Sequence, residues 1–177
     1  DLDGIKIING VEGIYYFLCR NSRIGNFLWN KLFKRELFIS NSIRFPEKMD
    51  YGEDAVTVFK CIFYSKIITC IDKPYYNYLQ RKNSITKKIS TKELLFIENV
   101  NSISNFLKSN NKWSDYSPYF KNYMLRLLLN INGRALKNIN NTEAQLLRNQ
   151  VVIYLKDESI IKIMFDKYIE KKQKIRK

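Results

Sequence analysis

Apolar residues recur at helical spacing near the start of the chain. The residues that would share one side of this helix are Val11, Ile14, Tyr15 and Leu18. Asn9 and Glu12 have the spacing of a capping box, in which each side chain bonds the backbone N–H of the other residue. We expect the helix to end before Arg20, where polar residues begin.

A second helix is predicted after a turn rich in acidic residues. The turn covers residues 50–54, and it precedes an apolar stripe made of Ala55, Val56, Phe59, Ile62 and Phe63. Glu53 and Asp54 are therefore expected at the N-terminus of that helix. Further along, the β-branched segment 67–71 and the aromatic segment 75–78 predict two strands with a turn between them.

From residue 90 onward the pattern becomes helical. Apolar spacing over 119–135 predicts a long helix, and residues 160–168 predict a last helix that runs into a basic tail. Three helix starts are indicated, two by capping boxes and one by a cap followed by proline: Ser90 with Glu93, Thr142 with Gln145, and Ser117 with Pro118. The predicted fold class is α+β, predominantly α-helical, with a few short strands.

The composition indicates a globular protein and excludes several kinds of chemistry. Of the 177 residues, 45% are hydrophobic and 14% aromatic, which excludes intrinsic disorder. The absence of histidine excludes His-dependent triads and His-ligated zinc, so a general base would have to be a carboxylate or a less common group. Cys19, Cys61 and Cys70 lie far apart among apolar neighbours, which favours buried, reduced thiols and a cytosolic protein.

The charge is strongly positive, with 31 Lys and Arg against 17 Asp and Glu and a net charge of +14. Segments 20–44, 73–92 and 171–177 carry +5, +6 and +5 of it. Such a surface attracts nucleic acid, anionic lipid headgroups or phosphorylated small molecules. No apolar run reaches the roughly 18 residues that span a bilayer. The last helix and its tail either lie on an anionic membrane surface or pack on the protein with solvated cations.

Glu53 and Asp54 are the best candidates for catalysis. Placed on a helix, both point away from the apolar stripe, so neither is needed for packing. A helix N-terminus stabilises an ionised carboxylate, which suits a group that must accept a proton at neutral pH. Acids in a first helical turn are also common simply because they complement the helix dipole, and the pair alone favours that simpler interpretation.

Two further segments could bind a substrate. Taken alone, residues 29–35 favour an amphipathic turn in which Trp29, Leu32 and Phe33 pack inward and Lys31 stays in water. Arg81 and Ser84 belong to a loop that groups cations with small hydrogen-bond donors, as a phosphate-binding loop or an ordinary solvated loop would.

Five segments together resemble the C-terminal half of bacterial family 2 glycosyltransferases. In order they read WNKLFKRELF at 29–38, IRFPE at 43–47, GED at 52–54, IDKPYYNY at 71–78 and RKNSIT at 81–86. The resemblance covers roughly residues 10–86. It implies a GT-A α/β fold whose acceptor-side remnant is residues 1–89, with the nucleotide-binding half missing. Residues 90–177 would be a helical C-terminal extension.

The resemblance also implies an activity and roles for individual residues. Such enzymes transfer a sugar with inversion from a nucleotide-sugar donor to a glycan or lipid-linked acceptor, in the biosynthesis of capsule, exopolysaccharide or lipopolysaccharide. Asp54 would be the base that deprotonates the acceptor hydroxyl, and Glu53 would orient the acceptor or a metal. The residues implied in substrate binding are Trp29, Asn30 and Lys31 on the acceptor side, and Arg81 and Ser84 at the diphosphate.

In that family an Asp-x-Asp motif at a strand end holds a divalent metal, Mg or Mn, on the donor diphosphate. Asp1 and Asp3 match the motif formally, but no apolar strand precedes them. We therefore expect the metal in a full-length parent and not on this chain, which would be inactive alone. The expected location is the cytoplasm, peripheral on the inner face of the cell membrane. The alternative is a basic helical protein that binds nucleic acid or regulates without enzymatic activity, but no recognisable nucleic-acid-binding motif supports it.

Overall fold

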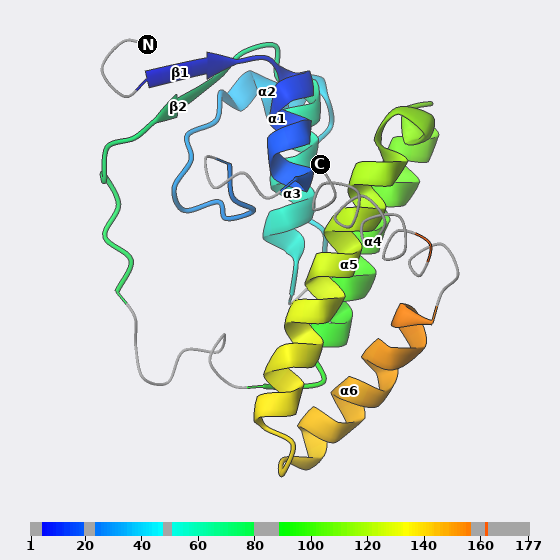
Figure 1. Ribbon diagram of the computed structural model, residues 1–177. Coiled ribbons are helices and arrows are strands. Elements are labelled where there is room, and N and C mark those ends of the chain that lie inside the picture. The colour runs from blue at the N-terminus through cyan, green and yellow to red at the C-terminus, as the bar shows by residue number, and fades with distance from the viewer. Residues whose placement is uncertain (1–4, 20–23, 48–50, 80–88, 157–161, 163–177) are drawn as a thin grey trace, which may run out of the picture.

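The computed structural model describes residues 5–19, 24–47, 51–79, 89–156 and 162. Within these residues, helices predominate and a small sheet lies beside the N-terminal end of α1 (Figure 1), which confirms the predicted fold class. In chain order, the elements are β1 (Ile5–Ile8), α1 (Gly10–Leu18), α2 (Arg35–Ser40), α3 (Glu53–Tyr64), β2 (Ile68–Ile71), α4 (Glu93–Ser109), α5 (Trp113–Lys137) and α6 (Thr142–Leu155).

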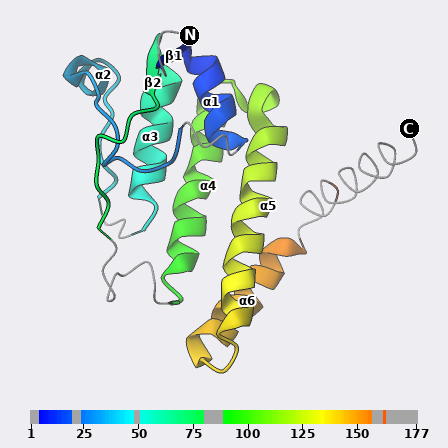
Figure 2. The same cartoon turned by 60° about the vertical axis from the view of Figure 1, so that its left-hand side comes forward.

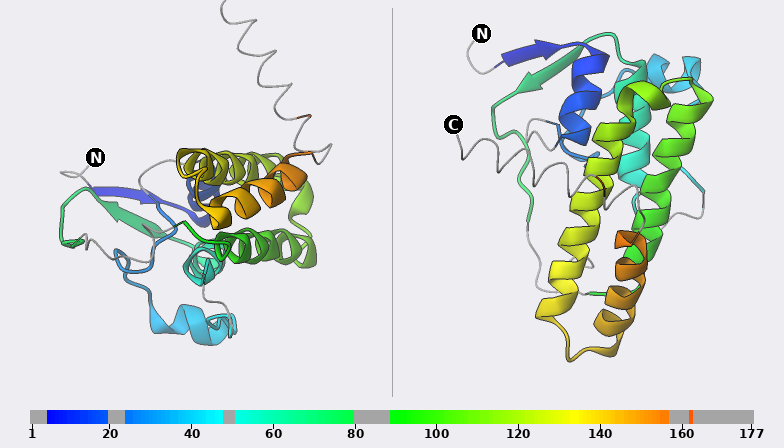
Figure 3. Two further views of the ribbon diagram at one scale, coloured as in Figure 1. Left: turned by 90° about the horizontal axis from the view of Figure 1, so that it is seen from below. Right: turned by 45° about the vertical axis from the view of Figure 1, so that its right-hand side comes forward.

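The sheet differs from the prediction in its pairing. β2 forms as expected, but it pairs antiparallel with β1, with Ile5 opposite Ile71 and Ile8 opposite Ile68. The predicted strand at 75–78 is wrong, since those residues have no regular secondary structure and are exposed. Pairing with β1 places Ile8 and Cys70 in the hydrophobic core, a gain in burial that the exposed aromatic segment does not provide. The sheet extends to one side of the helices (Figure 3).

The capping box of α1 is confirmed. Asn9 Oδ1 accepts from the Glu12 N–H at 2.9 Å, and a Glu12 carboxylate oxygen accepts from the Asn9 N–H at 3.1 Å. The helix ends at Leu18, before Arg20, as expected. Its predicted apolar side is partly wrong, because Val11 and Tyr15 are exposed. The buried residues of the helix are Gly10, Gly13, Ile14, Phe17 and Leu18.

Glycine explains this shift of the buried side. A Cβ on Gly10 would lie 2.3 Å from the Ser65 carbonyl oxygen, and one on Gly13 would lie 2.8 Å from the Ile62 side chain. Both contacts are with α3 or the residue that follows it. The small residues therefore set a close approach of α1 to α3, and this approach decides which side of α1 faces inward.

The apolar stripe of α3 is confirmed. Ala55, Val56, Phe59 and Ile62 are buried, and Phe63 packs against the core. Cys61 and Cys70 are buried and Cys19 is partly exposed, and all three are free thiols, as predicted. Burial raises the pKa of the Cys61 thiol to about 11.

The three predicted starts of the C-terminal helices are wrong in detail. α4 begins at Glu93 with Lys92 and not Ser90 as its N-cap; the Glu93 carboxylate interacts with the Ser90 backbone N–H and also accepts from Arg134 of α5 at 3.0 Å. α5 begins at Trp113, so Pro118 lies inside the helix near its start. α6 is capped by Asn141, one residue before Thr142, through a bond from the Ala144 N–H. Contacts between residues distant in the sequence, and a neighbouring residue that caps equally well, explain why the observed helix starts differ from the predicted ones.

The core is continuous from the first part of the chain to the second. α1 and α3 pack on α5 and α4 respectively, and α6 packs on α4 and α5. Figure 2 shows α2 on the outer side of α3, away from α4 and α5. The division between 1–89 and 90–177 remains a prediction. The predicted helix at 160–168 and the basic tail lie outside the described residues, apart from residue 162.

Candidate functional site

The turn before α3 is held in place by α4. Gly52 is the N-cap of α3 and has a φ of +86°, a left-handed conformation that favours glycine. The side-chain amide of Asn99, on α4, donates to the Tyr51 carbonyl. Phe96, also on α4, would lie 3.0 Å from a Cβ at Gly52. These contacts place Glu53 in a defined position at the start of the helix.

Both candidate acids stand in the first turn of α3, as predicted. Glu53 and Asp54 are partly exposed, whereas Ala55 and Val56, directly after them, are buried in the core. The two carboxylates thus lie at the boundary between core and solvent.

Lys31 is brought into electrostatic contact with Asp54. Its Nζ donates to the Phe27 carbonyl at 2.6 Å and to Asn30 Oδ1 at 2.7 Å. Burial lowers the pKa of Lys31 to about 8, and the Asp54 carboxylate acts in the opposite direction by favouring the ammonium form. Two segments far apart in the sequence therefore meet at this lysine.

The amphipathic-turn interpretation of residues 29–35 is only partly right: Phe33 packs against the core as predicted, but Lys31 and Leu32 do not lie as predicted. Lys31 is partly buried instead of solvated, and Leu32 is fully exposed instead of packed inward. Trp29 is 37% exposed. The loop is shaped by the bonds of Lys31 to Phe27 and Asn30, which draw the ammonium group back onto its own backbone.

Trp29 is the centre of a group of rings that we call the aromatic stack, made of Phe27, Trp29, Tyr76 and Tyr78. The ring centroid of Trp29 lies 5.3 Å from that of Phe27, 4.6 Å from that of Tyr76 and 5.2 Å from that of Tyr78. The interplanar angles are 28°, 30° and 17°. The sequence prediction included only Trp29 of these rings. The aromatic run at 75–78 is the feature of the sequence that could have identified Tyr76 and Tyr78, but its pattern predicts a strand.

The remaining predicted site residues divide into two groups. Asn30 is exposed and bonded to Lys31, so it belongs to the same loop surface as Trp29. Arg81 and Ser84 lie outside the described residues, as do Asp1 and Asp3. Among these candidates, the charges of Lys31 and Asp54 interact, and the roles of all the site residues stay predictions.

The described residues do not fit a metal ion. In that part of the chain, no group of three or more Cys, Asp or Glu side chains gathers in a way that could hold one. We therefore derive no chemical step through a metal on this chain. The described helices also include none that is long and apolar enough to cross a membrane.

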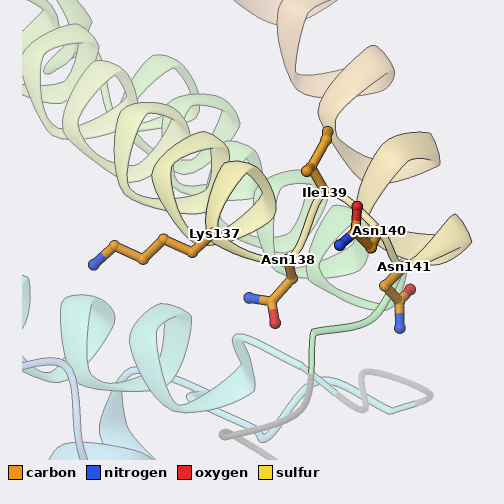
Figure 4. Close-up of a pocket in the computed structure, with 5 residues that line it drawn as sticks. All are labelled: Lys137, Asn138, Ile139, Asn140 and Asn141. Carbon is orange, nitrogen blue, oxygen red and sulfur yellow. The ribbon is translucent and has the colours of Figure 1, made fainter.

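Two pockets are present elsewhere on the described surface. One, of about 440 Å³, lies at the turn between α5 and α6 and is lined by residues 137–141 (Figure 4). The other, of about 450 Å³, is lined by residues of α1, α4 and α5 together with residues 24–27. Neither pocket is lined by the candidate acids, but Phe27 of the aromatic stack borders the second.

Comparison with known proteins gives one similarity that bears on function. The chain is 26% identical over 99 residues to the protein named "Putative glycosyltransferase EpsH" of Bacillus subtilis (strain 168). The match covers 53% of this chain and 28% of that protein. No family model matches the chain, and no solved structure matches it.

Proposed function

We propose that this chain is the acceptor-side part of a bacterial glycosyltransferase of family 2 with a GT-A type fold. The observation that carries the proposal is the meeting of Lys31 with Asp54. Residues 29–31 and 52–54 are separate segments of the family resemblance, and the charges of Lys31 and Asp54, one from each segment, interact. The similarity to a protein named as a putative glycosyltransferase supports the same proposal.

In this proposal Asp54 is the general base. Its carboxylate takes the proton from an acceptor hydroxyl as the hydroxyl oxygen attacks the anomeric carbon of the donor sugar. The bond from that carbon to the nucleoside diphosphate breaks, and the configuration inverts. Glu53 orients the acceptor. The Asp54 carboxylate in turn favours the ammonium form of Lys31, which can then hydrogen-bond an acceptor oxygen.

The donor side of the reaction is assigned to a longer protein that contains this chain. Binding of the nucleotide sugar, and of a divalent Mg or Mn ion on its diphosphate, would be the task of residues outside the described part, with Arg81 and Ser84 closing over the diphosphate. The acceptor would be a glycan or a lipid-linked glycan in surface-polysaccharide biosynthesis. The location that fits is the cytoplasmic face of the cell membrane, where the tail at 171–177 would contact anionic lipid.

Substitution of Asp54 by Asn in the full-length protein tests this proposal. A positioned base contributes about 10²–10⁴-fold to rate, so Asp54→Asn should lower sugar transfer by that factor. Transfer is measured with radiolabelled nucleotide sugars and lipid extracts from the source cells, and donor affinity by equilibrium dialysis. Donor affinity should stay unchanged.

Asp115 provides a matched control. It also stands in the first turn of a helix, α5, where its carboxylate pairs with Lys112 at 3.2 Å. Asp115→Asn removes the same charge from a helix N-terminus away from the candidate site and should leave transfer unchanged. Near-normal transfer by Asp54→Asn would refute the assignment of the base.

A further inference from the structure

The aromatic stack places four large rings at the surface of the protein. Phe27, Tyr76 and Tyr78 are 49%, 50% and 51% exposed. Their ring planes lie within about 30° of the Trp29 plane, whereas core pairs such as Phe59 with Phe106 meet edge-on at 90°. Four rings thus gather at the surface with much of their area in water, where hydrophobic burial is incomplete.

The surroundings of the stack indicate what it can bind. Lys31 Nζ is bonded to the carbonyl of Phe27, a member of the stack, and the same ammonium group interacts with the Asp54 carboxylate. The Lys31 ammonium group thus hydrogen-bonds one member of the stack and interacts electrostatically with one of the candidate acids. A ligand that fits both must offer an apolar face to the rings and hydroxyl donors to the carboxylates.

We propose that the aromatic stack is a platform for a pyranose ring of the acceptor. The C–H groups on one face of a pyranose carry partial positive charge and suit the negative face of an aromatic ring. Its hydroxyl groups can donate to Glu53 or Asp54. This inference rests on the proposed function and adds the residues that hold the acceptor, Tyr76 and Tyr78 among them.

Single-stranded nucleic acid is the competing ligand, because bases also stack on exposed aromatic rings. The candidate acids argue against it, whereas segments 20–44 and 73–92, which hold the stack and carry net charges of +5 and +6, attract a polyanion. Two carboxylates stand in the first turn of α3, and the nearby ammonium of Lys31 already donates to two oxygens of its own loop. A phosphate backbone would meet repulsion at these acids, whereas a neutral saccharide would not.

The tryptophan fluorescence of the full 177-residue chain can test the proposal directly. The chain has two tryptophans, so Trp113→Phe leaves Trp29 as the reporter. The probes are α- and β-linked hexasaccharides of glucose, β-linked hexasaccharides of N-acetylglucosamine, and a 12-nucleotide oligouridine. We expect at least one saccharide to change the Trp29 emission in a saturable way and the oligouridine to bind more weakly.

Variants of the tyrosine segment provide the control. By analogy with nucleobase stacking, where loss of a ring costs about 5–150-fold in affinity, Tyr76→Ala and Tyr78→Ala should each weaken saccharide binding at least fivefold. Tyr78→Phe keeps the ring and should retain binding. Tyr75→Ala should have no effect, since Tyr75 is 76% exposed and is not part of the stack. Circular dichroism checks that each variant is folded.

Three results would overturn the platform: no saccharide binding, saccharide binding that survives loss of Tyr76 and Tyr78, or tighter binding of the oligouridine. Because this assay needs no donor, it separates the two proposals. Saccharide binding together with full transfer by Asp54→Asn would refute the assigned base and leave the platform standing. Absence of binding together with a strong Asp54→Asn effect would refute the platform alone.

Discussion

Replacement of Gly52 by alanine should destabilise the protein through the backbone that positions the candidate acids. Gly52 has a φ of +86°, and an L-residue in the left-handed region costs about 1–2 kcal/mol. The new Cβ would also lie 3.0 Å from the Phe96 ring and 3.3 Å from the Asn99 Cβ, so α4 would have to give way. The reduced entropy of the unfolded chain offsets about 0.4–1 kcal/mol. Overpacking against α4 adds about 1–3 kcal/mol, so the expected net loss is about 1–5 kcal/mol.

Urea denaturation of wild type and variant measures this loss as a shift of the midpoint at constant slope. Gly133→Ala is the matched control, since Gly133 lies within α5 and a Cβ there meets nothing within 4 Å. That variant should gain up to about 1 kcal/mol from helix propensity. If Gly52→Ala were as stable as wild type while Gly133→Ala gained, the account of the turn before α3 would be refuted.

Two further predictions concern buried groups. Burial raises the pKa of Glu93 above its ordinary value of 4.5, although Arg134 acts in the opposite direction, so the folded protein holds this proton more tightly than the unfolded chain. Stability should therefore fall as pH rises from about 4.5 through the raised pKa, and Glu93→Gln should show a smaller fall in urea denaturation over a pH series. Equal slopes would contradict this. The second prediction is that iodoacetamide at pH 8 modifies Cys19 before Cys61, because Cys61 is 1% exposed and has a pKa of about 11. Mass spectrometry of timed samples checks it, and early labelling of Cys61 would count against the described packing.

Sequence reasoning succeeded where the controlling interactions are local. The capping box of Asn9 and Glu12 needs only residues three apart, and the stripe of α3 follows from the helical period. The acids Glu53 and Asp54 were placed correctly in the first turn for the same reason. The cap at Asn141 was missed by one residue because Asn and Thr are both good caps and stand side by side.

Sequence reasoning failed where segments distant in the chain compete. The start of α4 was interpreted as a capping box, but Glu93 pairs with Arg134 of α5, a partner that local spacing does not reveal. The aromatic segment at 75–78 predicts a second strand after β2, but the strand that pairs with β2 is β1, since that pairing places Ile8 in the core. The free energy gained by burying apolar area favours this pairing over pairing with a segment that directly follows β2 in the sequence.

The sequence by itself determined the helical character of the chain, the position of the acids at the start of α3 and the positive charge. These properties depend on residue type and on spacing within a few residues. Only the tertiary structure decided that the charges of Lys31 and Asp54 interact and that the rings of Tyr76 and Tyr78 pack on Trp29. Each of these arrangements involves separate segments. It forms because the free energy gained from burial and packing of the whole chain compensates the entropy lost when those segments come together.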